Sequence, residues 1–341
     1  MGYDVTIGIP VYQVEAYLTQ SLLSALAQSY PSIEYLIVDD GCTDRSMDIV
    51  CKLQREHARG GDIRILSHAT NRGVAVSRNR IIEEAKGAFL YFMDADDTIS
   101  ENTISLLMDQ VRQYDAEIVF ASYEKIDLSG RKTLYQYPSL LLLEKDQLAV
   151  FAYRKYGGIQ ASACNFVVKT ALLRDIRLRF IDTDYWEDLA FVFDLVTYVS
   201  RAVLLPDITY SYYCRTGSLS HYQERGLIGK EEVLRNVRTI DSLKQSSLRL
   251  SDKEYYPRRC YCIVMTDYYM ACHIIRHRRT ITPPVTNCEM RDMLSHPASF
   301  RQICSFRQMR MRNLLLYLLG RLPAPICWAV VWCIDQCKRQ F

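Results

Sequence analysis

Short apolar runs alternate with helix-period segments from Val5 to about Phe120, and this alternation limits the possible fold more than any other feature. The runs lie at residues 5–9, 33–38, 63–66, 88–93 and 117–121, and between the first three of them apolar residues recur at spacings of three and four. The pattern predicts consecutive βαβ units. Right-handed crossovers then bring the carboxyl ends of the strands to one edge of a parallel sheet. We therefore expect an α/β fold that binds its ligand at that edge.

The fourth run ends abruptly in a cluster of carboxylates. Residues 89–97 read FLYFMDADD, so Asp94, Asp96 and Asp97 follow a segment that suits a strand buried on both faces. Asp94 and Asp96 form a D-x-D pair that can hold a hard divalent cation on a diphosphate. Acids at such a place also form solvated turns and helix caps, and the cluster alone does not decide between these interpretations.

Proline and an aromatic residue follow the first run. Pro10 ends the predicted strand because it cannot donate to the sheet ladder, and a helix begins at about Glu15. Tyr12, which lies between them, can stack on a planar base or pack beneath a helix.

The second and third runs are followed by residues of similar type. Asp39 ends the second run, where its carboxylate can accept a hydrogen bond from a base, and Thr43 or Asp44 can cap the next helix. After the third run, Gly73 allows the backbone to approach a ligand closely, and Arg78 lies one turn into the next helix, within reach of phosphate or base.

The whole-chain composition is that of an ordinary folded protein of 341 residues. The first residues show neither the basic nor the apolar part of a secretory signal, so we expect a cytoplasmic protein. Twelve cysteines are scattered among apolar neighbours and none form a C-x-x-C pair, which predicts reduced thiols in the core.

Charge is distributed unevenly along the chain. Residues 1–225 hold 23 Lys and Arg against 30 Asp and Glu, whereas residues 226–341 hold 19 against 9. We therefore expect an acidic catalytic domain over residues 1–225 and a basic, helical region over residues 226–341. The basic region lacks an aromatic-interleaved motif and the predicted cleft is acidic, so nucleic acid is not an expected partner.

Four motifs in this order resemble family 2 glycosyltransferases of the GT-A fold. They read IPVYxxExYLxxSLxSxLxQ, VDDGxTDxS, NxGVxxxRN and DADD, and the resemblance extends from Val5 to about Ser220. It implies a nucleotide-diphospho-sugar-binding α/β domain whose donor is a UDP-sugar. Cys42 and Ser77 are small departures from the family pattern.

The resemblance also implies roles for individual residues. Pro10 and Tyr12 would contact uracil, Glu15 would support their loop, Asp39 would bind the base and Arg78 the nucleotide. Asp94 would lie near the ribose, and Asp96 would bind Mg²⁺ or Mn²⁺ on the diphosphate. In the later segment YSYYCRTGSLSH, the candidates near the donor phosphates are Arg215, Ser218 and Ser220, with His221 a weaker candidate metal ligand.

Two further acids begin a predicted helix after residue 186. Glu187 and Asp188 precede apolar residues at helical spacing, where acids favour the helix dipole. The same dipole keeps Asp188 ionised, and the resemblance implies that this carboxylate is the base that deprotonates the acceptor hydroxyl.

The last apolar stretch, residues 313–334, has the length of a membrane span but is interrupted by Arg321, Pro323 and Pro325. With flanking basic residues and two tryptophans, it suits two short helices in the cytoplasmic face of an anionic membrane. Core helices and a homodimer surface are the alternatives.

The motifs together imply inverting transfer of a sugar to a hydroxyl of a glycan or a lipid-linked glycan during surface polysaccharide synthesis. The alternative is an inactive nucleotide-binding partner subunit of a glycan assembly complex. A nucleotidyltransferase would need a glycine-rich phosphate loop where this chain has PVYQVE.

Overall fold

The computed structural model describes residues 2–154, 158–183, 186–215 and 227–339. The chain divides into two compact units, each built from three segments. The first contains Met1–Leu148, Ala161–Asp182 and Leu195–Ser218, and the second contains Ala149–Gln160, Thr183–Asp194 and Leu219–Phe341. The sequence suggested a single boundary near residue 225. Instead, two segments before that residue belong with the C-terminal helices.

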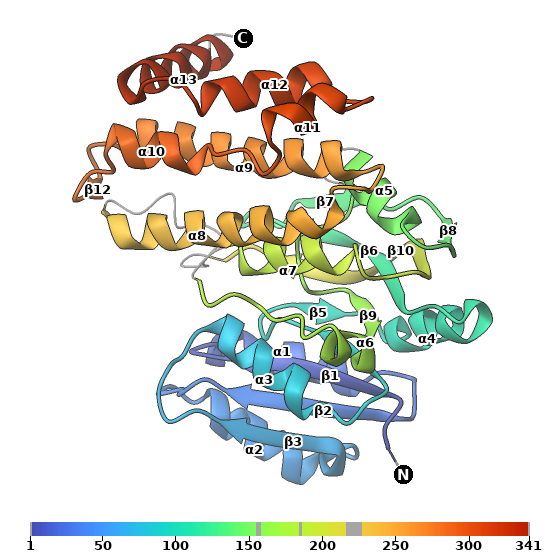
Figure 1. Ribbon diagram of the computed structural model, residues 1–341. Helices are drawn as coiled ribbons and strands as arrows, with labels where there is room; N and C mark the ends of the chain where they lie inside the picture. Colours follow the sequence, from blue (N-terminus) through green and yellow to red (C-terminus); the bar gives the residue numbers. More distant parts are fainter. Residues whose placement is uncertain (1, 155–157, 184–185, 216–226, 340–341) are drawn as a thin grey trace. The chain divides into compact units, whose positions relative to one another are not determined.

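The first unit contains a ten-stranded sheet and the helices that cover it (Figure 1). Its elements are β1 (Val5–Val11), α1 (Glu15–Leu26), β2 (Ile33–Asp39), α2 (Ser46–Glu56), β3 (Ile63–Ser67), α3 (Val74–Glu84), β4 (Phe89–Phe92), β5 (Thr98–Ile99), α4 (Thr103–Tyr114), β6 (Ile118–Ile126), β7 (Lys132–Tyr135), β8 (Leu140–Leu142), β9 (Phe166–Lys169), α6 (Thr170–Asp175) and β10 (Ala202–Tyr213).

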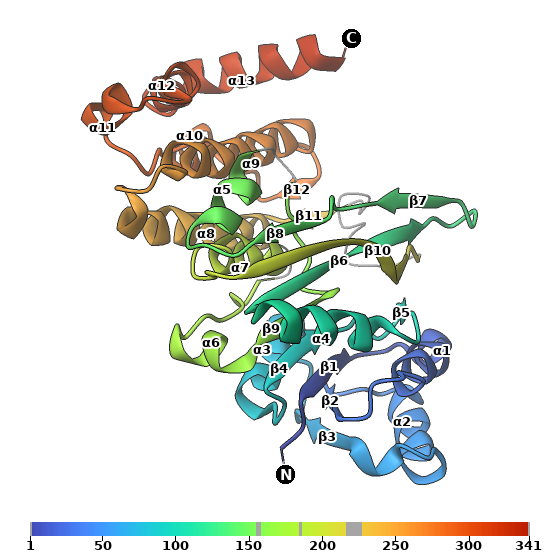
Figure 2. The ribbon, with the colours of Figure 1, turned by 90° about the vertical axis from the view of Figure 1, so that its right-hand side faces the viewer.

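The sheet is parallel in its first half and mixed in its second. Its main path runs β3-β2-β1-β4-β9-β6-β10-β5, and neighbours among the first four strands are parallel. All five predicted strands are present. The strand β9, which the apolar runs did not predict, lies between β4 and β6 and is antiparallel to both. Figure 2 shows β6 and β10 as long neighbouring strands beyond it.

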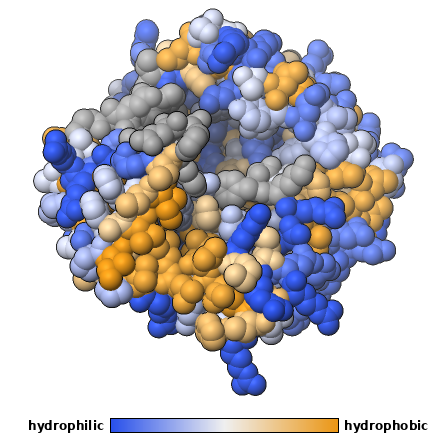
Figure 3. All heavy atoms as spheres, turned by 90° about the horizontal axis from the view of Figure 1, so that it is seen from above, coloured by the Kyte–Doolittle hydropathy of each residue, from blue (hydrophilic) through white to orange (hydrophobic). Residues whose placement is uncertain are grey.

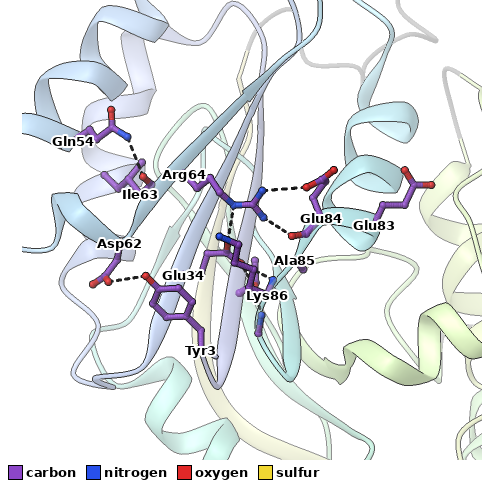
Figure 4. Close-up of polar contacts among 12 residues, drawn as sticks. Tyr3, Glu34, Gln54, Asp62, Ile63, Arg64, Glu83, Glu84, Ala85 and Lys86 are labelled. Carbon is purple, nitrogen blue, oxygen red and sulfur yellow. Dashed lines mark hydrogen bonds and ion pairs between the residues drawn. The ribbon is translucent and has the colours of Figure 1, made fainter. Parts of the chain in front are cut away.

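The amino-terminal end of the parallel strands is held by one buried carboxylate (Figure 4). Glu34, 1% exposed in β2, accepts hydrogen bonds from the Thr6 hydroxyl at 2.6 Å and from the Lys86 backbone N–H at 2.8 Å. Its other oxygen accepts from Arg64 Nε at 2.8 Å. A buried carboxylate is stable only when it is paired and hydrogen-bonded in this way. Glu34 therefore has a structural role, at the end of the strands opposite to the predicted site.

The second unit is mainly helical, as the sequence predicts (Figure 1). It contains most of α5 (Gln147–Arg154) and α7 (Glu187–Leu195), and all of β11 (Ile228–Gly229), α8 (Lys230–Ser247), α9 (Tyr256–Arg276), β12 (Ile281–Thr282), α10 (Asn287–Met293), α11 (Phe300–Ser305), α12 (Arg310–Leu319) and α13 (Ala324–Arg339). Its core includes buried side chains from α9, α10, α12 and α13. Residues 313–334 therefore form two helices that are joined around Pro323, and no helix in the described ranges is both long and apolar enough to cross a membrane.

All twelve cysteines are free thiols, in agreement with the prediction. The expectation that they are core residues is wrong for four of them. Cys288, Cys304, Cys333 and Cys337 are exposed.

Candidate functional site

The carboxyl ends of the first four strands meet at one edge of the sheet, as the βαβ pattern predicts. Val11 at the end of β1 pairs with Asp39 at the end of β2, and Asp39 pairs with Ser67 at the end of β3. On the other side of β1, Phe92 at the end of β4 pairs with Gly8. The four loops that follow these strands therefore begin next to one another.

The loops after β1 and β2 are joined by a set of reciprocal hydrogen bonds. Gln13 Oε1 accepts from the backbone N–H groups of Thr43 and Asp44 at 2.9 and 3.1 Å. Asp44 Oδ2 accepts from the Glu15 N–H at 3.0 Å, and Glu15 Oε2 accepts from the Arg45 N–H at 2.9 Å. Asp44 therefore holds this pair of loops and also accepts from an N–H at the start of α2. Glu15 therefore links the start of α1 to the start of α2.

Sequence reasoning missed Gln13, which makes two of these contacts and also donates from Nε2 to the Thr43 hydroxyl at 2.8 Å. Its φ of 49° lies in the left-handed region, which non-glycine residues adopt only where the surroundings impose it. Nothing in the local sequence signals this conformation.

Asp40 joins the loop after β2 to the loop after β3. It is 3% exposed and accepts from the N–H groups of Arg72 and Gly73 at 2.9 and 2.8 Å, and it lies 2.7 Å from His68 Nδ1. Gly41 beside it has a φ of +76°, and a Cβ there would lie 2.8 Å from the backbone of residues 70 and 71. This close approach explains the glycine after the two aspartates.

The predicted base-contact residues lie at this edge with different exposures. Tyr12 is 45% exposed, so it does not pack beneath a helix, which was the alternative for this side chain. Pro10 is the sixth residue of β1 and is half-buried, and β1 continues one residue beyond it to Val11. The Asp39 carboxylate accepts from the Cys42 N–H at 2.9 Å, which orients it within its own turn.

Arg78 contacts the first aspartate of the DADD cluster. It is 3% exposed on α3, and its guanidinium donates to Asp94 Oδ1 at 2.8 Å. The guanidinium also lies 5.4 Å from the centre of the Phe180 ring. Arg78 is therefore not a solvated helix residue, because its guanidinium is held against a carboxylate at the edge where the carboxyl ends of the strands meet. Gly73, with a φ of +88° and open space around its Cα, begins the same helix.

Asp96 and Asp97 face different partners. Asp96 is paired with Arg215, whose guanidinium also lies 5.4 Å from the centre of the Tyr17 ring. Asp97 is 1% exposed and accepts from the Tyr210 hydroxyl at 2.6 Å and from the Tyr213 N–H at 2.9 Å. Asp97 thus holds the end of β10 against the DADD turn, whereas Asp96 borders an open pocket.

The proximity of these acids alters their proton affinity. Burial and the neighbouring charge of Asp94 raise the pKa of Asp96, while Arg215 acts in the opposite direction. Burial, followed by the charges of Asp94 and Asp96, raises the pKa of Asp97 well above its usual range. The carboxyl groups of Asp96 and Asp97 are therefore protonated more easily than that of an exposed aspartate.

A pocket of about 190 Å³ opens beside Asp96 and Arg215. Tyr17, Gln20 and Tyr213 also line it. Its volume is below the range of about 300–1,000 Å³ typical of sites that enclose a whole small molecule. The pocket fits one polar portion of a larger ligand.

The D-x-D pair fits one particular kind of metal site. The structure places no group of three His, Cys, Asp or Glu for a metal ion among the residues it describes. Asp94 and Asp96 supply two carboxylates, and Mg²⁺ commonly binds through one or two carboxylates with substrate phosphates and water completing the shell. The donor set therefore fits a cation that arrives with a diphosphate.

The sequence predicts four further site residues. Asp188 is in the first turn of α7, as predicted, and belongs to the second unit. Ser218, Ser220 and His221 lie outside the described residues.

The second unit holds α7 through an arginine that sequence reasoning missed. Arg259 on α9 is fully buried, pairs with Asp194, and donates to the Phe193 carbonyl at 2.9 Å and the Tyr153 hydroxyl at 2.6 Å. These contacts fix the carboxyl-terminal part of the helix whose first turn carries Asp188. Burial acts to lower the pKa of Arg259, but Tyr153 and the carboxylate of Asp194 together raise it above its usual value, so the charge is retained.

Comparison with known proteins gives a family match over half of the chain. The model of the family described as "Glycosyl transferase family 2" matches residues 6–177. Glycosyltransferase GlyG of Streptococcus pneumoniae is 28% identical over 224 residues, which are 64% of this chain and 73% of that protein. The succinoglycan biosynthesis protein ExoO of Rhizobium meliloti is 22% identical over 272 residues, which are 77% of this chain and 76% of that protein.

Among solved structures, the chain is similar to Staphylococcus aureus TarS 1-349 in complex with UDP-GlcNAc. The TM-score is 0.57 at 18% sequence identity, and the match covers 93% of this chain and 90% of that one. At this identity the likeness establishes a shared fold.

Proposed function

Because the chain belongs to family 2 of the glycosyltransferases and has their GT-A fold, we propose that it transfers a sugar from a UDP-sugar to a hydroxyl group of a glycan or lipid-linked glycan. One observation carries the choice of donor. Two carboxylates and two arginines, Asp94 with Arg78 and Asp96 with Arg215, converge at the strand edge where α/β folds bind ligands. Paired opposite charges of this kind suit a diphosphate that brings its own cation.

The loops after β1 and β2 bind the base in this proposal. The exposed Tyr12 ring stacks on uracil beside Pro10, and the Asp39 carboxylate accepts a hydrogen bond from the base N–H. The hydrogen bonds of Glu15 hold the Tyr12 loop in place before the nucleotide arrives, which lowers the entropy cost of binding.

The arginines and the DADD cluster bind the rest of the nucleotide. Arg78 and Arg215 would donate to phosphate oxygens, and Asp94 would lie near the ribose. Asp96 with Asp94 would hold Mg²⁺ or Mn²⁺. When bound, the cation offsets the negative charge that develops on the departing UDP. Gly73 leaves open space for the nucleotide at the start of α3. Ser218 remains a proposed phosphate contact.

Asp188 acts as the general base. The amino-terminal end of α7 favours its ionised form, and the carboxylate accepts the proton of the acceptor hydroxyl late, as the new bond to the sugar forms. The acceptor oxygen attacks from the face opposite UDP, so the configuration at the anomeric carbon inverts. The carboxylate forms no covalent bond to the sugar.

The acceptor is a growing surface polysaccharide or its lipid-linked precursor. This part of the proposal is supported by the relative named for succinoglycan biosynthesis.

Calorimetric titration of UDP, with GDP as the control nucleotide, tests the donor assignment. Wild-type protein should bind UDP with micromolar affinity in the presence of Mn²⁺ and bind GDP much more weakly. Asp96→Ala should weaken binding of UDP with Mn²⁺ at least about tenfold, because it removes a ligand for the cation. Asp109→Ala, an exposed acid on α4, is the matched control and should bind like wild type.

Failure of both nucleotides to bind under any condition would contradict the proposed activity. The chain would then be an inactive member of its family, acting as a partner subunit in glycan assembly.

A further inference from the structure

The outward face of α12 is apolar and exposed. Met311, Leu315 and Leu318 are 65, 64 and 48% exposed, and their spacing of four and three places them on one face of the helix. The opposite face is buried through Leu316 and Leu319. Single apolar residues scattered over a protein surface are normal, but a continuous apolar stripe on the solvent side of a helix marks an interaction site. The stripe on α12 therefore indicates a binding partner.

The next helix continues the apolar surface. On α13, Ile326 and Trp332 are 51 and 42% exposed, whereas Cys327 and Val331 are completely buried in the core of the second unit. Figure 3, viewed toward the end of the molecule where α12 and α13 lie in Figure 1, shows apolar residues gathered in a continuous area beside strongly hydrophilic ones. We call the exposed side chains of Met311, Leu315, Leu318, Ile326 and Trp332 the apolar face.

Positive charge borders the apolar face. Successive helix residues are about 100° apart, so Arg310 and Arg312 lie on either side of the Met311 direction, and both are exposed. Arg321, between the two helices, is also exposed and lies 5.2 Å from the centre of the Tyr317 ring. Arg310 Nε donates to the Phe306 carbonyl at 3.0 Å, and the Arg312 guanidinium lies 5.8 Å from the centre of the Tyr261 ring. Both side chains are nevertheless exposed, and exposed arginines can turn their charged ends toward an anionic layer.

Negative charge is almost absent from this part of the sequence. Residues 295–341 contain seven Lys and Arg and a single acid, Asp335. Asp335 is 1% exposed and is paired with Arg276, so it does not offset the surface charge. A second copy of the chain docked on the same face would bring arginine against arginine. An anionic lipid surface complements both the apolar residues and the charge.

We propose that the apolar face docks into the interface of a membrane that contains anionic lipids, with α12 and α13 lying along the surface. In this mode each helix lies on the bilayer and buries only one side. Docking depends neither on the donor nor on catalysis, so it stands or falls independently of the proposed function.

Vesicle co-sedimentation of the full chain tests the proposal. Wild-type protein should bind vesicles of phosphatidylcholine with phosphatidylglycerol at least about tenfold more tightly than vesicles of phosphatidylcholine alone, and rising ionic strength should weaken that binding. Leu315→Glu with Leu318→Glu should lower the affinity at least about tenfold, because it removes apolar burial and adds negative charge. Arg310→Gln with Arg312→Gln should lower it about tenfold while leaving the apolar residues intact.

Leu134→Glu is the matched control. Leu134 is 56% exposed on β7, an element of the first unit, and its substitution should leave vesicle binding unchanged. Circular dichroism of each variant checks that it is folded. Two results would overturn the proposal: wild-type protein that does not bind anionic vesicles, or equal binding by wild type and the Leu315/Leu318 variant. A dimer in analytical ultracentrifugation that this variant dissociates would assign the face to a second copy instead.

Discussion

Three carboxylates in one short motif perform different tasks because their neighbours differ. Asp97 is enclosed and bonded to Tyr210 and to the backbone of Tyr213, so it maintains the turn. Asp94 and Asp96 face arginine side chains, which ligand phosphates can also attract. The D-x-D spacing singles out Asp94 and Asp96 in the sequence, and the contacts show that Asp97 has a structural role.

Replacement of Asp188 by Asn tests the proposed base. The amide keeps the shape of the side chain but cannot accept the proton, so sugar transfer should fall by about 10²–10⁴-fold. UDP affinity should stay within about twofold of wild type, because none of the proposed donor contacts is changed. Both quantities are measured on one preparation, by product formation and by calorimetry. Asp109→Asn provides the same chemical change at an exposed site and should leave turnover unaltered. Near wild-type turnover in Asp188→Asn would remove Asp188 from the mechanism.

At the level of elements, the site depends on how the loops after β1, β2 and β3 hold one another. Gly41→Ala tests this dependence, because the substitution strains a positive φ and places a Cβ against the backbone of residues 70 and 71. We expect a loss of about 1–3 kcal/mol in the free energy of unfolding together with weaker UDP binding. Gly61→Ala is the control, since its Cβ would meet no atom within 4 Å and its backbone needs no positive φ. Equal stability of the two variants in denaturant titration would mean that the loops adjust freely.

The elements that sequence predicted are those with a regular period. The strands of the parallel half are short apolar runs, and the helices between them repeat apolar residues at spacings of three and four. Because consecutive βαβ units place these strands in parallel, Asp39 and Asp94 lie at the same edge of the sheet. The strand β9 has only four residues and pairs antiparallel with β4 and β6. A segment this short has no periodic pattern of apolar residues from which a strand could be predicted.

Contacts between distant segments also escaped sequence reasoning. Arg259 is a charged residue in an otherwise helix-like stretch, and its burial depends on carbonyl and hydroxyl groups about 65 and 105 residues away. Asn165 is 1% exposed and donates to the carbonyls of Ala121 and Ser122 at 2.8 and 2.9 Å. These roles are set by tertiary packing, which periodicity does not encode.

At the scale of the whole molecule, the last two helices belong to the core of the second unit on one side and face outward on the other. Val331→Asp should therefore destabilise the protein by more than about 3 kcal/mol, since it buries an unpaired carboxylate at a position with no exposure. Ile326→Asp, on the same helix but half-exposed, should change stability by less than about 1 kcal/mol. Thermal unfolding of both variants provides the comparison. A small effect of Val331→Asp would show that α13 is not part of the folded core.

The chain passes between the two units five times, because each unit is assembled from three separate segments. During synthesis on the ribosome, the segments that contain most of α5 and α7 emerge well before α8 and α9, with which they form the second unit. Until those later helices have left the exit tunnel, Tyr153 and Phe193 lack the guanidinium of Arg259 that bonds to both. A premature stop after the sheet would leave these aromatic segments uncovered, as a target for chaperones and proteases.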